Sequence, residues 1–177
     1  MAFIVEDGTG ITNSNAYISV TDFRTYWGDR GVSYGSLTND QIQGYIVQAT
    51  QYIDSRYAFK GYPTNDTQEL YWPRTNGSGG EIVDTRSRKT IAVNVIPDIL
   101  KSSMCELTAI INDKGNGNIN DNLSNNITSQ KVGVMSIGYG SSNGSQYGGS
   151  NSTAFSEYRV VTNYIKGVLT TSGVIRV

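Results

Sequence analysis

Residues 38–57 read TNDQIQGYIVQATQYIDSRY, and this stretch decides the fold of the chain. Thr38 and Gln41 have the spacing of a capping box, in which each side chain satisfies a free backbone N–H group at a helix start. The apolar side chains that follow recur every three or four residues and share one helical face: Ile42, Tyr45, Ile46, Ala49, Tyr52, Ile53 and Tyr57. Gly61 and Pro63 end the pattern, which predicts a helix of about twenty residues.

Three more helices are expected around this one. A short helix should begin at Ser19, whose hydroxyl can cap its first turn. Pro97 suits the first turn of another helix, because its missing N–H has no helical partner there anyway. A fourth helix is expected over residues 152–172, where apolar residues again recur at helical spacing. The helical core is therefore predicted over about residues 19–115 and 152–172.

Strand patterns and polar connections complete the expected fold. Ile82-Val83 and residues 91–93 could flank a β-hairpin, and the alternation over residues 127–140 predicts a β-ribbon. Gly (20), Ser (19), Thr (17) and Asn (16) make up 72 of the 177 residues, which favours long polar loops. We expect a mainly α protein: a single domain over residues 1–177, built as a small bundle of about four helices with a β-hairpin or ribbon.

The composition removes most catalytic chemistry. The chain contains no histidine, which excludes Ser-His-Asp and Cys-His catalysis and zinc sites that use imidazole. The single cysteine, Cys105, falls on a predicted buried helix face and is expected to be an inert core thiol. An enzyme that uses carboxylates alone stays possible in principle, but no pair stands out. We therefore expect no catalytic residue, no metal, no cofactor and no enzymatic activity.

Charge is nearly balanced, with 14 Lys and Arg against 15 Asp and Glu, whereas a domain that binds nucleic acid over a broad surface usually has a basic excess. One loop holds the only basic cluster: Arg86, Arg88 and Lys89. The cluster is either a solvated loop tip balanced by nearby carboxylates or a contact for phosphate or an acidic partner. No apolar run is long enough to span a membrane, and the N-terminus lacks signal-peptide features. We expect synthesis in the cytoplasm and no membrane contact.

Two apolar segments and one aromatic residue are candidate partner-binding sites. The C-terminal tail, residues 173–177, contains Val174, Ile175, Arg176 and Val177, and so apolar a terminus is usually covered by something. The predicted β-ribbon offers Lys131, Val132, Val134 and Tyr139. Trp72, beside Arg74, is either a packing anchor or an interface hot spot.

Several stretches, taken in order, resemble small head–tail connector proteins of tailed bacteriophages, a family whose members are often labelled DnaT-like single-stranded DNA-binding proteins. The matching stretches are Ile4–Gly10 with residues 13–17 and Ser19-Val20; Gln48–Asp54 with Arg56-Tyr57 and Lys60-Gly61; Gln68, Leu70 and Trp72–Arg74; Ile96-Pro97 with Cys105–Leu107; and Lys131–Gly133 with Tyr139. Together they cover most of the chain, although each stretch alone is a weak signal.

The resemblance implies a helical adaptor in the virion neck, at the head–tail interface. Such adaptors form a homo-oligomeric ring, here of about twelve copies, below the portal protein. The ring would extend the channel through which double-stranded DNA passes and dock the next neck or tail protein. The alternative is a single-stranded DNA-binding accessory protein that uses Arg74, Arg86, Arg88 and Lys89, with bases stacked on Tyr or Trp.

Overall fold

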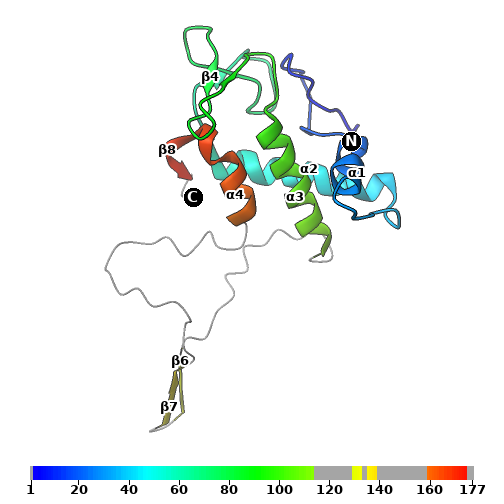
Figure 1. Cartoon of the computed structure of the whole chain (residues 1–177), viewed down its shortest axis with the longest axis vertical. Helices are drawn as coiled ribbons and strands as arrows, with labels where there is room; N and C mark the ends of the chain where they lie inside the picture. Colours follow the sequence, from blue (N-terminus) through cyan, green and yellow to red (C-terminus); the bar gives the residue numbers. More distant parts are fainter. Residues whose placement is uncertain (1, 114–128, 133–134, 139–158, 175–177) are drawn as a thin grey trace. The chain divides into compact units, whose positions relative to one another are not determined.

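The computed structural model describes residues 2–113, 129–132, 135–138 and 159–174 (Figure 1). The chain divides into two compact units, one of residues 1–119 and 158–177 and the other of residues 120–157. In the second unit the described residues form one hairpin, in which β6 (Ser129–Val132) pairs antiparallel with β7 (Met135–Gly138). This hairpin agrees with the β-ribbon expected over residues 127–140. The single domain over residues 1–177 stays a prediction.

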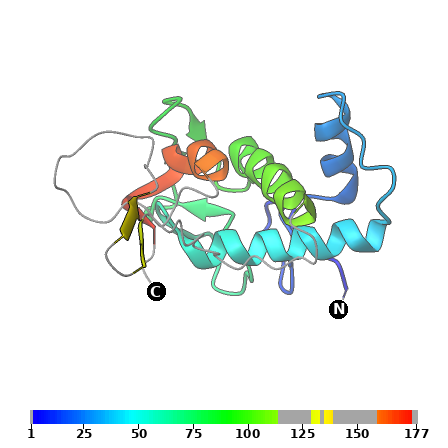
Figure 2. The same cartoon turned by 90° about the horizontal axis from the view of Figure 1, so that it is seen from below.

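The described part of the first unit contains four α-helices. They are α1 (Val20–Gly28), α2 (Asn39–Arg56), α3 (Asp98–Asp113) and α4 (Arg159–Ile165). Capping boxes start α1 at Ser19 and Asp22 and α2 at Thr38 and Gln41. The Ser19 cap and the Thr38 capping box are both as predicted. Figure 2 shows α3 laid across α2, with α4 on one side of α3 and α1 towards the other. None of the helices among the described residues is long and apolar enough to cross a membrane.

The hydrophobic core lies where these helices meet. The apolar face predicted for α2 points inwards, and Ile42, Ile46, Ala49 and Ile53 are all fully buried. Fully buried side chains from the other helices belong to the same core: Phe23 of α1; Leu100, Met104 and Leu107 of α3; and Val161 and Ile165 of α4, which packs on α3. The helices are thus held mainly by apolar burial, at roughly 25 cal/mol per Å² removed from water.

In the described part of the first unit, six short strands form three antiparallel pairs. β1 (Tyr57–Phe59) pairs with β8 (Leu169–Val174), β2 (Tyr62–Pro63) with β3 (Arg74–Thr75), and β4 (Ile82–Val83) with β5 (Thr90–Ile91). The last pair is the hairpin expected near residues 82–93. Each pair is a separate two-stranded sheet.

The prediction of a mainly α bundle is wrong, because the chain is a small α/β protein. Where we expected one helix to continue to residue 172, α4 ends at Ile165, and the chain passes through a 3-10 turn, η2 (Lys166–Val168), into β8. Similarly, α2 ends at Arg56, and Tyr57 begins β1 opposite Val174. Helical periodicity is a local signal, whereas each of these strands forms because of a partner more than a hundred residues away.

Candidate functional site

The stretch Ile4–Gly10, which opens the resemblance, forms a loop around one buried carboxylate. Glu6 is 2% exposed and its side chain accepts hydrogen bonds at 2.8–3.1 Å from the N–H groups of Gly8, Gly10 and Ile11 and from the Ser14 hydroxyl. Gly8 has a φ of +106°, and a Cβ there would lie 2.0 Å from the Asn94 carbonyl oxygen. Glu6 and Gly8 therefore hold the loop together.

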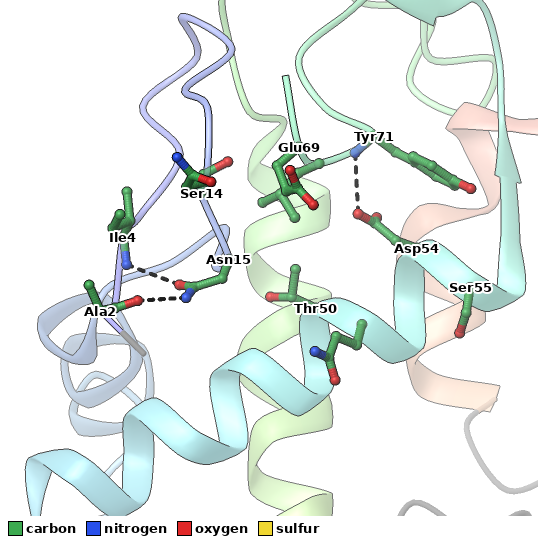
Figure 3. Close-up of a pocket in the computed structure, with 12 residues that line it drawn as sticks. Ala2, Ile4, Ser14, Asn15, Thr50, Asp54, Ser55, Glu69 and Tyr71 are labelled. Atoms are coloured by element: carbon green, nitrogen blue, oxygen red, sulfur yellow. Dashed lines mark hydrogen bonds between the residues drawn. The ribbon is translucent and has the colours of Figure 1, made fainter. Parts of the chain in front are cut away.

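Tyr17 and Asp54 join the N-terminal segment to α2. The buried Tyr17 hydroxyl lies 2.8 and 2.9 Å from the two Asp54 carboxylate oxygens and accepts the Trp72 N–H at 3.2 Å. The Tyr71 N–H donates to Asp54 at 3.2 Å (Figure 3). Burial raises the pKa of Asp54 to about 6, although the bonds from Tyr17 and Tyr71 act in the opposite direction.

Arg74, in β3, has its guanidinium directed into the protein. The residue is 8% exposed, and its N–H groups donate to the carbonyl oxygens of Lys60 (2.8 Å), Tyr71 (3.0 Å), Phe59 (3.4 Å) and Gly61. Burial lowers the pKa of Arg74, and the nearby Tyr17 and Asp54 partly offset that effect. Arg74 thus ties the β1–β2 turn to the chain that leads into β3.

Trp72 is fully buried, with its ring 5.9 Å from that of Phe59 in an edge-to-face arrangement. Its indole N–H has no hydrogen-bond partner in the described part of the chain. Trp72 is therefore a packing anchor of this subunit. Contact of Trp72 or Arg74 with a partner, which stays a prediction, would require this region to open.

A groove of about 550 Å³ lies over these motif residues (Figure 3). Its walls come from the N-terminal segment, from α2 and from residues 69–71; among its lining residues are Ile4, Asn15, Thr50, Asp54, Glu69 and Tyr71. Among the residues that the structure describes, the lining includes two carboxylates, Asp54 and Glu69, and no Lys or Arg. The described lining of the groove therefore offers an anion no cationic side chain.

The opposite charge is found at the end of α4, in a second depression of about 560 Å³ that we call the basic pocket. It is lined by Thr85, Arg86, Asn163, Lys166 and Gly167. The loop between β4 and β5 docks here because the Thr85 N–H donates to the Gly167 carbonyl at 3.0 Å. Gly167 permits this approach, since a Cβ there would lie 1.7 Å from an Asp84 carboxylate oxygen.

Two cations, Arg86 and Lys166, line this pocket, and a third, Lys60, is hydrogen-bonded to two of its lining residues. Arg86 donates one guanidinium N–H to the Asn163 carbonyl at 2.6 Å. The Lys60 ammonium donates to the carbonyl of Gly167 (2.7 Å) and the hydroxyl of Thr85 (3.1 Å). These bonds also satisfy carbonyl groups at the helix end, where positive charge is favoured. Lys60 and Lys166 were missed by the sequence analysis, because nothing local links them to Arg86.

Asp84 is the carboxylate beside this cluster, and its charge interacts with that of Lys60, so it offsets part of the positive charge. It is 6% exposed and accepts hydrogen bonds from the Ser87 hydroxyl (2.6 Å) and the Arg86 N–H (2.9 Å). Burial alone would raise the pKa of Asp84, but these hydrogen bonds outweigh it and the pKa is lowered. Arg88 and Lys89, on the same loop, are exposed.

The structure thus separates the predicted site residues. Arg86, Arg88 and Lys89 lie on one loop, apart from the buried Arg74. Val174 is the last residue of β8, whereas Ile175, Arg176 and Val177 lie outside the described residues. Lys131 and Val132 belong to β6, and Val134 and Tyr139 lie outside the described residues.

The described residues hold no group of His, Cys, Asp and Glu side chains suited to a metal ion. Cys105 is 2% exposed, and burial raises the pKa of its thiol to about 12. The thiol is therefore protonated near neutral pH and unsuited to nucleophilic attack.

A family model described as "Putative DnaT-like ssDNA binding protein" matches residues 1–177, the whole chain. The chain belongs to this family. No curated protein and no solved structure was found to match it. The family's description refers to single-stranded DNA and not to a portal or tail, so it favours the DNA-binding alternative over the head–tail adaptor prediction.

Proposed function

We propose that this member of the DnaT-like family is a structural head–tail adaptor of a tailed-phage virion, with no enzymatic activity of its own. The observation that supports the proposal is that the motif side chains make hydrogen bonds within the protein. Glu6, Tyr17, Asp54 and Arg74 bind one another or the backbone, so the stretches that carry the resemblance build a scaffold. A scaffold of this kind suits a protein whose partners are other proteins.

The charge of the chain is compatible with this role. A ring through which double-stranded DNA passes should not hold the DNA tightly, and a net charge of −1 provides little overall attraction. The partners proposed are other copies of the chain in a ring of about twelve, the portal protein and the next neck or tail protein.

The direct test is to look for the protein in purified virions and then to image it with its portal protein by negative-stain electron microscopy. The proposal predicts a ring bound to the portal. A protein that is absent from purified particles would refute it.

The proposed docking role of the C-terminal tail can be tested separately. Deleting Ile175–Val177 leaves β8, which ends at Val174, intact, so the subunit should still fold. We expect this truncation to abolish neck assembly. Infectious particles at wild-type yield would show that these residues are not needed for docking.

The second candidate function is single-stranded DNA binding, which the family's description favours. Of the residues expected to contact DNA, Arg74 and Trp72 are buried, whereas Arg86, Arg88 and Lys89 are exposed. Filter binding of labelled single-stranded DNA at low salt tests this function. Retention that falls steeply with added salt would support it, and no retention at low salt would eliminate it.

A further inference from the structure

Positively charged residues that are far apart in the sequence lie close together at the basic pocket. Arg86 comes from the β4–β5 loop and Lys166 from η2, and both line the pocket. Lys60, the residue after β1, does not line it but donates hydrogen bonds to two lining residues, Thr85 and Gly167. Among the described residues no carboxylate lines the pocket, and Asp84, which lies beside Gly167, is hydrogen-bonded within its own loop and offsets only part of the charge of these cations. Although the chain as a whole has a net charge of −1, this surface is locally cationic.

Several donors in the pocket remain available to a ligand. A guanidinium has five N–H donors, and Arg86 uses one of them, for the Asn163 carbonyl, within the described residues. The Lys166 ammonium makes no hydrogen bond or ion pair with any described residue, and the Lys166 side chain is exposed. An arginine fork and an ammonium group on one concave surface are well suited to phosphate oxygens.

We propose that the basic pocket binds phosphate groups of a nucleic-acid backbone. A polynucleotide presents phosphates in a row, and the β4–β5 loop carries two further exposed cations, Arg88 and Lys89, beyond Arg86. This site goes beyond the adaptor role and provides the second candidate function with a location. Because the contact is to the backbone, the site should not read sequence.

Binding can be measured by fluorescence anisotropy on the full chain with a labelled oligo(dT) and with a labelled duplex. If three to five phosphates are contacted, log K should fall against log salt with a slope of about −2 to −3.5 for the single strand. A binding constant that does not change with salt would overturn the proposal.

Two variants with the same change in net charge locate the contact. Lys166→Glu places a carboxylate in the basic pocket, and Lys101→Glu makes the same change at an exposed position of α3 that lines no part of the pocket. At low salt we expect Lys166→Glu to weaken oligo(dT) binding about tenfold or more and Lys101→Glu less than about threefold. Equal weakening by both variants would contradict the proposal, since net charge alone would then explain it.

A second variant and a folding control complete this test. Arg86→Gln should also weaken binding. Thermal unfolding of each variant will show that it is folded; Lys166→Glu removes no hydrogen bond of the described structure.

The class of ligand is tested by a parallel titration in which a labelled poly-glutamate replaces DNA. If poly-glutamate binds and depends on Lys166 while neither nucleic acid binds, the pocket is a site for an acidic protein and the proposal is wrong. The presence of the chain in virions tests the adaptor role independently.

Discussion

Arg74 and Arg86 both lie in the region of short strands, and the fold uses them in opposite ways. Arg74 is 8% exposed and donates to four backbone carbonyl groups, whereas Arg86 is exposed and uses one N–H at the rim of a pocket. The two nearby surface depressions also differ in charge: the groove over Asp54 is acidic, whereas the basic pocket beside Lys166 is cationic. A basic residue of this chain can therefore be assigned to a ligand site only when the structure shows that its side chain is exposed.

The difference has a simple energetic basis. A buried charged group is tolerated only when it is fully hydrogen-bonded, and its partners lose their bonds if it is removed. An exposed charge on a loop contributes little to stability, because water and salt screen it. The residues around Arg74 should therefore control folding, and those around Arg86 should control binding.

The largest expected effect comes from removing the buried guanidinium. Arg74→Met leaves the carbonyl groups of Phe59, Lys60 and Gly61 without this donor, and we expect a loss of about 3 kcal/mol in the free energy of unfolding. Arg86→Met should change stability by less than about 0.5 kcal/mol. Urea denaturation monitored by circular dichroism measures both changes. Comparable losses in the two variants would contradict the view that Arg74 stabilises the fold and Arg86 does not.

An intermediate effect is expected where the loop docks on η2. Gly167→Ala puts a methyl group where an Asp84 carboxylate oxygen lies 1.7 Å away, so the loop must move, at a cost of about 2 kcal/mol. The same variant should weaken oligo(dT) binding, because it displaces Arg86. Gly44→Ala is the matched control, because nothing lies near a Cβ there; it should stabilise α2 by up to about 1 kcal/mol.

The smallest expected effect is a pH dependence of the free energy of unfolding, caused by Asp54 in the acidic groove. Asp54 has a folded-state pKa of about 6 against an ordinary value of 3.8, so between these values the folded chain binds more protons than the unfolded chain. This carboxyl group therefore favours folding as the pH falls from 7 to 5, by about 1 kcal/mol. In Asp54→Asn that part of the pH dependence should disappear, and urea midpoints at the two pH values will show whether it does.

The sequence predicted the elements whose signals are local. The Ser19 N-cap and the Thr38 capping box start α1 and α2 as expected, because the bonds involved lie within four residues. Neither the strand nature of β8 nor the burial of Trp72 could be predicted in this way. Phe59 pairs with Leu169 and packs on Trp72, and such contacts depend on segments that only the complete fold brings together.

The amino-acid sequence alone therefore establishes the positions of most helices, the absence of histidine chemistry and the family to which the chain belongs. How each charged residue is used depends on the tertiary structure. Arg86 and Lys166 share one pocket, with the Lys60 ammonium hydrogen-bonded to its lining residues, because a glycine at position 167 allows the loop to approach. Helical spacing and capping act over a few residues, whereas burial and electrostatic surroundings are properties of all the residues that pack around a side chain.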